Sequence, residues 1–195
     1  MKTPYQLHPW HGIEQPKNFP QKIHVFVEFV PTDVMKYEID KHSGHLKIDR
    51  PQRFSNQCPA PYGFLPQTYC GEKIAKLANV SKGDGDPLDV CVLTERPIQN
   101  GGILLTAIPI GGLRMIDKDE ADDKIIAVLD EDPLYGHMKD LSEVPEKVIT
   151  RLKHYFLTYK LNPGEMTSQV KIEAVYDASV ALQVINASRE DYNQL

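Results

Sequence analysis

Strand-like patterns fill the first quarter of the chain after an irregular start. Residues 1–22 are rich in proline and histidine and predict an arm lying on the body, whereas residues 23–30 form a β-branched and aromatic run that predicts a strand. Residues 36–40 and 45–50 alternate between apolar and polar positions and flank Lys41-His42-Ser43-Gly44. Two alternating segments joined by a short turn that ends in glycine predict a β-hairpin.

Apolar segments in the middle of the chain predict more short strands, at residues 88–93, 103–110, 113–116 and 125–129. In the first of these segments, alternation places Leu88 on one face and Asp89 on the other. Glycine and proline separate the segments, and helical patterns are few. The pattern therefore predicts a mainly β fold with some α, built on a closed or nearly closed barrel.

Helical periodicity dominates the last third of the chain. Apolar side chains recur at helical spacing after Pro145, at Val148, Leu152, Tyr155, Phe156 and Tyr159. Residues 169–175 predict a strand, and Asp177 is expected to be the N-cap of a final helix. A short helix is also expected at residues 72–78, inside an otherwise irregular stretch rich in proline and glycine. The apolar face of the helix after Pro145 is expected to pack against the sheet, with Tyr155 in the core.

Composition narrows the class of protein. A length of 195 residues fits a single domain covering residues 1–195, and the formal net charge of -5 argues against a nucleic-acid binder with a basic surface. The three cysteines, Cys58, Cys70 and Cys91, form no Cys-x-x-Cys pair, which argues against a disulfide framework or a structural zinc site. No segment approaches the ~20 apolar residues of a membrane span. We therefore expect a cytoplasmic protein without a membrane or nucleic-acid partner.

Three carboxylates gather in Gly83-Asp84-Gly85-Asp86-Pro87-Leu88-Asp89-Val90, with no basic residue among them. Like charges at close range repel, and burial strengthens the repulsion, so such a cluster needs solvent, protons or cations. Carboxylate oxygens are the ligands that hard cations such as Mg²⁺ prefer. A calcium loop of the EF-hand type does not fit, because Asp89 replaces its turn glycine. A solvated acidic turn remains the alternative.

Other charged positions bear on how this turn is interpreted. Residues 117–124 contain five acids in eight positions between two predicted strands, so they either fold back over the acidic turn or form a solvated loop. Glu28 interrupts an apolar strand and either faces a polar cavity or lies in water at a sheet edge. Basic residues are interleaved with these acids; they are Lys36, Arg50, Lys124 and Lys160. Carboxylates for cations and basic groups for phosphate oxygens are what metal-dependent phosphoryl transfer needs.

The acidic turn fits Asp-x-Asp-Pro-x-Asp, the signature of the family I soluble inorganic pyrophosphatases, which the chain resembles from about Ile23 to Lys160. Further blocks match in order: Val27-Glu28, Lys36-Tyr37-Glu38-Ile39-Asp40, Asp49-Arg50, Pro61-Tyr62-Gly63, Asp117 through Lys124, and His154-Tyr155-Phe156 with Tyr159-Lys160. The resemblance implies an inorganic diphosphatase, which hydrolyses pyrophosphate to two orthophosphates with several Mg²⁺ ions. It also implies an OB-like closed five-stranded β-barrel with flanking helices.

The same resemblance implies a role for each matching position. Metal coordination falls to Asp84, Asp89, Asp117, Asp122 and Glu28. Asp86 would be the general base, and Tyr62 would hydrogen-bond near the nucleophilic water. Substrate phosphates would be bound by Lys36, Arg50, Lys124, Tyr159 and Lys160, while Glu38 would act through water.

The family also implies a homo-oligomer, which is a hexamer if the chain is of the bacterial type. Cys58 stands where many bacterial members have a tyrosine, and residues 66–83 are longer than in the shorter bacterial forms. The second hypothesis is a non-catalytic barrel that binds metal or an oligonucleotide, as OB-type barrels often do. That function needs a basic groove with exposed aromatics, which the net charge does not favour.

Overall fold

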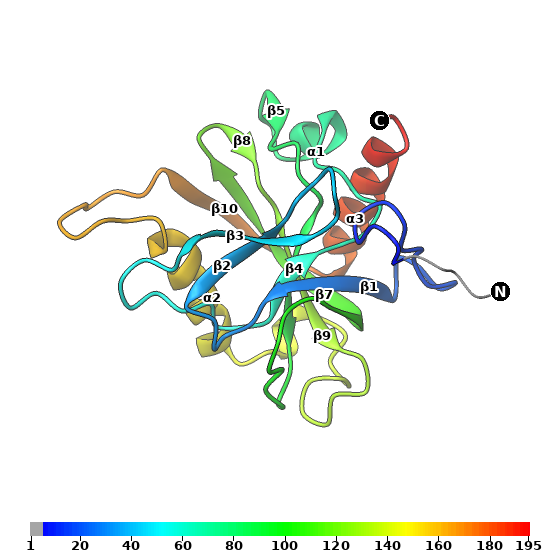
Figure 1. Cartoon of the computed structure of the whole chain (residues 1–195), viewed down its shortest axis with the longest axis horizontal. Coiled ribbons are helices and arrows are strands. Elements are labelled where there is room, and N and C mark those ends of the chain that lie inside the picture. Colours follow the sequence, from blue (N-terminus) through cyan, green and yellow to red (C-terminus); the bar gives the residue numbers. More distant parts are fainter. Residues whose placement is uncertain (1–5) are drawn as a thin grey trace.

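A ring of five strands forms the body of the protein in the computed structural model, which describes residues 6–195 (Figure 1). The ring consists of β1 (Ile23–Phe29), β4 (Tyr62–Phe64), β6 (Asp89–Leu93), β9 (Lys124–Leu129) and β7 (Ile103–Asp117). Each strand pairs with the next in this order, and β7 pairs back onto β1. The ring closes unevenly, since β4 has three residues and β7 has fifteen. The expected mainly β fold with an OB-like barrel is confirmed.

Two predictions about the strands are wrong. The proline- and glycine-rich stretch around the short helix was expected to be otherwise irregular, but it contains β4, which pairs with both β1 and β6. Residues 103–110 and 113–116 were expected to be separate strands, but they form the single strand β7. The glycine pair between them makes a bulge, where the pairing with β9 shifts register between Pro109 and Gly111. At Gly112 a Cβ atom would lie 2.4 Å from the ring of Tyr176, so glycine permits the close approach of β10 here. Glycine therefore bends the strand without ending it.

The remaining elements surround the ring. The short strands β5 (Lys82–Gly83) and β8 (Glu120–Ala121) pair with each other, and β10 (Val170–Asp177) pairs with β7. A separate hairpin consists of β2 (Met35–Ile39) and β3 (Leu46–Pro51), as expected. The helices are α1 (Glu72–Leu77), η1 (Leu141–Glu143), α2 (Glu146–Thr158) and α3 (Ala178–Tyr192). The positions of α1, α2 and α3 confirm the three predicted helices. As expected, Asp177 is the N-cap of α3, where its side chain accepts a hydrogen bond from Val180 N.

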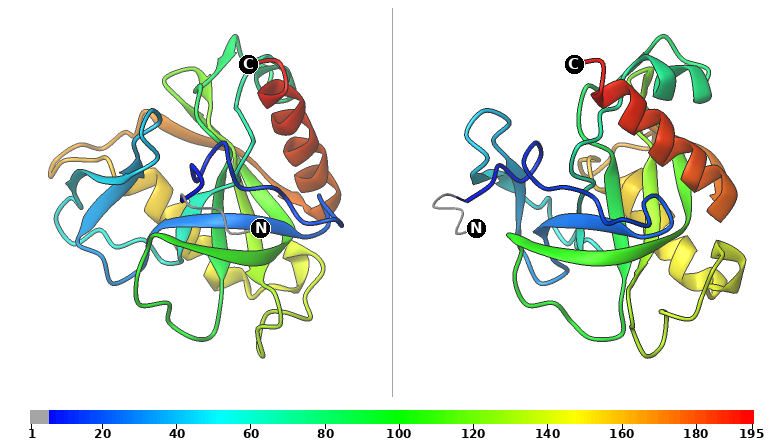
Figure 2. Two further views of the ribbon diagram at one scale, coloured as in Figure 1. Left: turned by 45° about the vertical axis from the view of Figure 1, so that its right-hand side comes forward. Right: turned by 90° about the vertical axis from the view of Figure 1, so that its right-hand side faces the viewer.

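The alternation of β6 divides the core as expected. Val90 and Val92, together with Leu88 just before the strand, pack with α1 and α3, whereas Cys91 and Leu93 pack with α2. Figure 2 shows α2 and α3 on different sides of the strands. Tyr155 of α2 lies in the core, as predicted, and all three cysteines are free. Asp89 is the first residue of β6, and it lies at the end of the barrel where several charged side chains line a cavity.

The N-terminal arm lies on the body, as predicted for the part from residue 6 onward; residues 1–5 lie outside the described chain. Trp10 anchors the arm, because it packs with Phe26 and Phe64 of the barrel and with Ile39 of the hairpin. Its Nε1 also donates to the carbonyl of Thr68 at 2.7 Å. The arm therefore joins the hairpin to the barrel (Figure 2).

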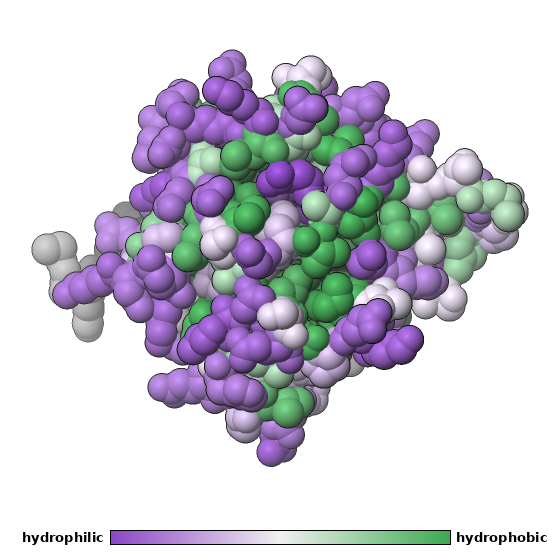
Figure 3. Space-filling model, turned by 180° about the vertical axis from the view of Figure 1, so that it is seen from behind, coloured by the Kyte–Doolittle hydropathy of each residue, from purple (hydrophilic) through white to green (hydrophobic). Residues whose placement is uncertain are grey.

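On the face seen from behind, apolar side chains extend from the middle toward the right-hand edge, with polar side chains among them and around the rest of the face (Figure 3). Within residues 6–195, none of the helices has the length and apolar character needed to cross a bilayer. The expected lack of a membrane partner stays a prediction.

The start of α1 depends on a carboxylate from α3. Asp191 accepts from Gly71 N at 3.0 Å, from Lys73 N at 3.0 Å and from Ile74 N at 3.2 Å, whereas the N-cap residue Gly71 has no side chain for this purpose. We expect Asp191→Ala to lower the free energy of unfolding by about 2–3 kcal/mol, because it leaves these donors without partners. Urea denaturation measures the loss, and Asp191→Asn, which keeps one acceptor oxygen, should lose less. Equal stability of Asp191→Ala and the wild type would contradict this role.

Candidate active site

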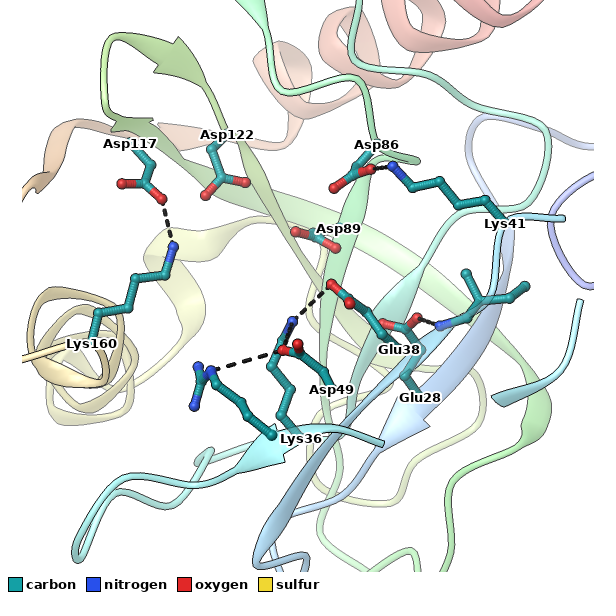
Figure 4. Close-up of polar contacts among 12 residues, drawn as sticks. Glu28, Lys36, Glu38, Lys41, Asp49, Asp86, Asp89, Asp117, Asp122 and Lys160 are labelled. Carbon is teal, nitrogen blue, oxygen red and sulfur yellow. Dashed lines mark hydrogen bonds and ion pairs between the residues drawn. The ribbon is translucent and has the colours of Figure 1, made fainter. Parts of the chain in front are cut away.

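A cavity of about 560 Å³ opens at one end of the ring. Its walls come from β1, the β2–β3 hairpin, β4, the loop before β6, the ends of β7 and β9, and the end of α2. Twelve of the thirteen predicted site residues line it: Glu28, Lys36, Glu38, Tyr62, Asp84, Asp86, Asp89, Asp117, Asp122, Lys124, Tyr159 and Lys160. Figure 4 shows part of this set entering a common space from different elements: Glu28, Lys36, Glu38, Asp86, Asp89, Asp117, Asp122 and Lys160.

Arg50 is the predicted residue that does not line this cavity. It lies in a neighbouring pocket with Lys160, and its guanidinium lies 5.7 Å from the ring centre of Tyr159. Its Nη1 donates to the carbonyl of Pro51 at 3.3 Å. Its Nε also lies 3.8 Å from Asp49 Oδ2, and Asp49 pairs with Lys36, so Arg50 lies beside the cavity next to two of its lining residues, Lys36 and Tyr159.

The loop carrying Asp84 and Asp86 is a fixed turn. Gly85 has a φ of +76°, a conformation that glycine adopts easily, and Asp84 Oδ1 accepts from Asp86 N at 3.0 Å. The backbone of Cys70 bonds to this turn twice, with Cys70 N donating to the Asp86 carbonyl at 2.8 Å and Gly85 N donating to the Cys70 carbonyl at 3.1 Å. The turn thus presents its acids from a rigid backbone.

The second acidic segment folds over the first, as expected. Lys118 and Asp119 adopt positive φ and reverse the chain, so that β8 pairs antiparallel with β7. The other edge of β8 pairs in parallel with β5. Asp84 N then donates to the Ala121 carbonyl at 3.2 Å, which joins the two acidic segments directly. Asp122 is 8% exposed, so the alternative of a fully solvated loop is wrong.

Lys124 lies between two of the carboxylates. Its ammonium donates to both Asp89 and Asp122, and the residue is 2% exposed. Burial alone would lower the pKa of Lys124, but the charges of Asp122 and Asp89 raise it well above its usual value. The ammonium group is therefore charged and partly neutralises the acids around it.

The charge of Lys124 does not neutralise all the buried acids of the cavity. Burial raises the pKa of Glu28 to about 8, and the charge of Asp89 adds to this shift. Burial and the charge of Asp122 raise the pKa of Asp84 to about 9, and burial also raises the pKa of Asp122. These carboxyls would ionise more readily if positive charge were placed among them, which is what a divalent cation provides.

Within the described chain, no three acidic, histidine or cysteine side chains are already arranged as a metal site. Lysine ammonium groups instead pair with the predicted ligands: Lys124 with Asp89 and Asp122, and Lys160 with Asp117. The residues nevertheless fit a hard cation, since buried carboxylates of raised pKa converge on one polar cavity.

Glu28 lies in the barrel wall. It is 5% exposed and lines the cavity, so the interpretation as an edge-strand residue in water is wrong. Its Oε1 accepts from Ile39 N at 2.7 Å, which links β1 to the hairpin.

Basic side chains occupy the walls facing the acids. Lys36 donates to Glu38 and to Asp49, both at 3.0 Å. Lys160 pairs with Asp117 and lies 5.2 Å from the ring centre of Tyr159. Positive and negative groups thus share one cavity, as expected for a site that binds both cations and an anionic substrate.

The turn of the hairpin is held by an ionised carboxylate. Asp40 Oδ1 accepts from Ser43 N and Ser43 Oγ, both at 2.8 Å, and these bonds lower the pKa of Asp40 from 3.8 to about 2. The stabilisation is present above pH 3.8 and is lost as the pH falls through about 2, because the carboxyl is then protonated in both the folded and unfolded states. An NMR titration of this carboxyl should give a midpoint near 2, and a midpoint at 3.8 would contradict the turn geometry.

Two charged residues that were given no role from the sequence contact predicted site residues, and further unpredicted charged residues, Asp40, Lys47 and Glu120, line the cavity. Asp49 pairs with Lys36, and Lys41 reaches across the cavity to Asp86 (Figure 4). Lys41 belongs to the predicted turn between the hairpin strands, where a lysine is usually in water. Nothing in the sequence around Lys41 indicates a site residue, because the distance between this turn and Asp86 depends on how the hairpin packs on the barrel.

Comparison with known proteins identifies related chains. A family model described as "Inorganic pyrophosphatase" matches residues 25–193. An inorganic pyrophosphatase of Chlamydia trachomatis is 46% identical over 100% of this chain and 98% of its own length. A soluble inorganic pyrophosphatase of Zea mays is 37% identical over 96% of this chain and 80% of its own. The crystal structure of inorganic pyrophosphatase from Thermus thermophilus superposes with a TM-score of 0.80 at 30% identity, covering 96% of this chain and 99% of that one.

Proposed function

The chain belongs to the inorganic pyrophosphatase family, and on that basis we propose that it hydrolyses inorganic pyrophosphate to two orthophosphates in the cavity described above. The observation that carries this proposal is the convergence of the carboxylates of Asp84, Asp89, Asp117 and Asp122 with Lys36, Lys124 and Lys160 in one cavity. A pyrophosphate anion needs such a mixture, because it carries dense negative charge and binds together with cations.

Mg²⁺ is the cofactor that we propose for this site. Asp84, Asp89, Asp117 and Asp122 would hold it, and Glu28 would assist from the barrel wall. Such ions supply charge neutralisation at the phosphates and make a bound water a better nucleophile at neutral pH. The raised pKa values of the buried acids support the assignment, since added positive charge would stabilise their ionised forms.

The chain's basic residues bind the substrate in this proposal. Lys36, Lys124 and Lys160 donate to phosphate oxygens, and Tyr159 adds its hydroxyl group from the end of α2. Arg50 reaches the outer phosphate from beside Tyr159. Donors placed before the reaction stabilise charge on the leaving phosphate without a reorganisation cost.

Asp86 is the general base. It lines the cavity and is half exposed, so its carboxylate can accept the proton as the oxygen of water attacks phosphorus and the bond to the bridging oxygen breaks. Tyr62 supports this step with a neutral phenol, because burial and the charge of Asp89 raise its pKa well above the usual value. Glu38 acts through water from the hairpin.

Phosphate release from pyrophosphate tests the proposal. With Mg²⁺ present the purified protein should release two orthophosphates per pyrophosphate, and EDTA should abolish the release. Parallel reactions with Mn²⁺ and Zn²⁺ determine the metal preference. A protein that binds divalent cations but releases no phosphate at any metal concentration would contradict the proposed function.

Cytoplasmic location and a homo-oligomeric state complete the proposal. Three buried free thiols are consistent with a reducing compartment. The 46% identity to a bacterial relative favours the hexamer that the family resemblance implies for bacterial-type chains. Light scattering coupled to gel filtration measures the mass, and a monomer of 22.1 kDa would contradict the oligomer.

A further inference from the structure

Lys41 makes a contact that the proposed roles do not use. Its Nζ donates to Asp86 Oδ1 and, at 3.5 Å, to the carbonyl of Gly85 (Figure 4). Lys41 therefore bridges the hairpin turn and the acidic turn across the mouth of the cavity. We propose that Lys41 is a positioning residue, which holds the Asp86 carboxylate in the orientation that its action as a base requires; this rests on the proposed function.

The hairpin turn places Lys41 firmly. Two residues before it, Ile39 is 5% exposed, packs with Trp10 and donates its N–H to Glu28. Asp40 and Gly44 close the turn, with Gly44 N donating to the Asp40 carbonyl at 2.8 Å and Gly44 at a φ of +74°. The base of the Lys41 side chain is thus fixed from both sides.

Without Lys41, hydrogen bonds would hold only the backbone of Asp86 and not its carboxylate. Its N–H donates to Asp84 and its carbonyl accepts from Cys70, but among the described residues its side chain bonds to Lys41 alone. Holding Oδ1 restricts rotation of the carboxylate, and the second oxygen is then left for the attacking water. A general base works only when its geometry toward the proton is right.

Stability does not explain the contact. The side chains of Lys41 and Asp86 are 54% and 41% exposed, and exposed ion pairs contribute only about 0–1 kcal/mol. Loss of Lys41 should therefore change catalysis much more than folding.

Lys41→Met separates these effects. We expect kcat for pyrophosphate to fall by about tenfold, with KM and the unfolding temperature nearly unchanged, since the substrate-binding lysines remain. Lys41→Arg, which keeps the charge and reach, should restore most of kcat. Lys73→Met is the matched control, because Lys73 forms an exposed pair with Glu190 at 3.0 Å on the far helices and should leave kcat unchanged.

A double-mutant cycle shows whether Lys41 acts through Asp86. In the Asp86→Asn background, Lys41→Met should cause no further loss, because the base that it positions is already absent. An equal tenfold loss in both backgrounds, or a rise in KM instead of a fall in kcat, would overturn the proposal and assign Lys41 to substrate binding. If Asp86→Asn itself keeps full activity, the assignment of Asp86 as the base fails; if only Lys41→Met is silent, the role of Lys41 alone fails.

Discussion

Asp86→Asn is expected to lower kcat for pyrophosphate hydrolysis by about 10³-fold, because asparagine has nearly the same shape but cannot accept the proton. Its amide oxygen can still accept from Lys41 and the side chain is 41% exposed, so we expect the free energy of unfolding to change by no more than about 0.5 kcal/mol. Steady-state phosphate release and urea denaturation measure the two quantities on the same preparation.

Asp119→Asn is the matched control for this variant. Asp119 is exposed in the second acidic segment and does not line the cavity, so the same chemical change there should leave kcat unaffected. Wild-type turnover by Asp86→Asn would remove Asp86 from the reaction, whereas a loss in both variants would indicate a general effect of net charge.

Lys124→Met is expected to have the second largest effect, on stability and activity together. Without the ammonium, Asp89 and Asp122 face each other unpaired, and removal of one partner from a buried ion pair costs about 3–5 kcal/mol. The loss should be largest in EDTA and smaller with Mg²⁺, because a cation between the carboxylates replaces part of the lost charge. Phosphate release should fall by about 10²-fold, since one preorganised donor to the substrate is lost.

Lys124→Arg tests whether the charge matters. It keeps the positive group and should retain more stability than Lys124→Met, although its larger head must fit the same buried space. Equal denaturation curves for Lys124→Met and the wild type in EDTA would contradict the neutralising role of Lys124.

The hairpin, β6 and the three α-helices were predicted correctly, because alternation, helical spacing and capping residues are patterns between residues close together in the sequence. Alternation placed Leu88, just before β6, and Asp89, its first residue, on opposite faces. Asp177 was recognised as a cap from its position before the last helix. The acidic turn was identified because three carboxylates without a nearby cation need a physical explanation. The roles assigned to the residues came from the family resemblance and stay predictions.

Features that depend on docking were not predictable. The glycine pair before Leu113 predicts a break, yet β7 continues through it, paired with β9 on one edge and with β10 on the other. Glu28 could have been in water, and only closure of the ring and docking of the hairpin bury it. Lys41 was missed for the same reason, since its distance to Asp86 depends on where the hairpin lies.

The position of bound divalent cations tests the account most directly. An anomalous difference map from a crystal grown with Mn²⁺ should show peaks inside the cavity, in contact with the carboxylates of Asp84, Asp89 and Asp122. Peaks found only elsewhere on the protein, with these carboxylates still paired to lysine, would contradict the claim that the acids form a metal site.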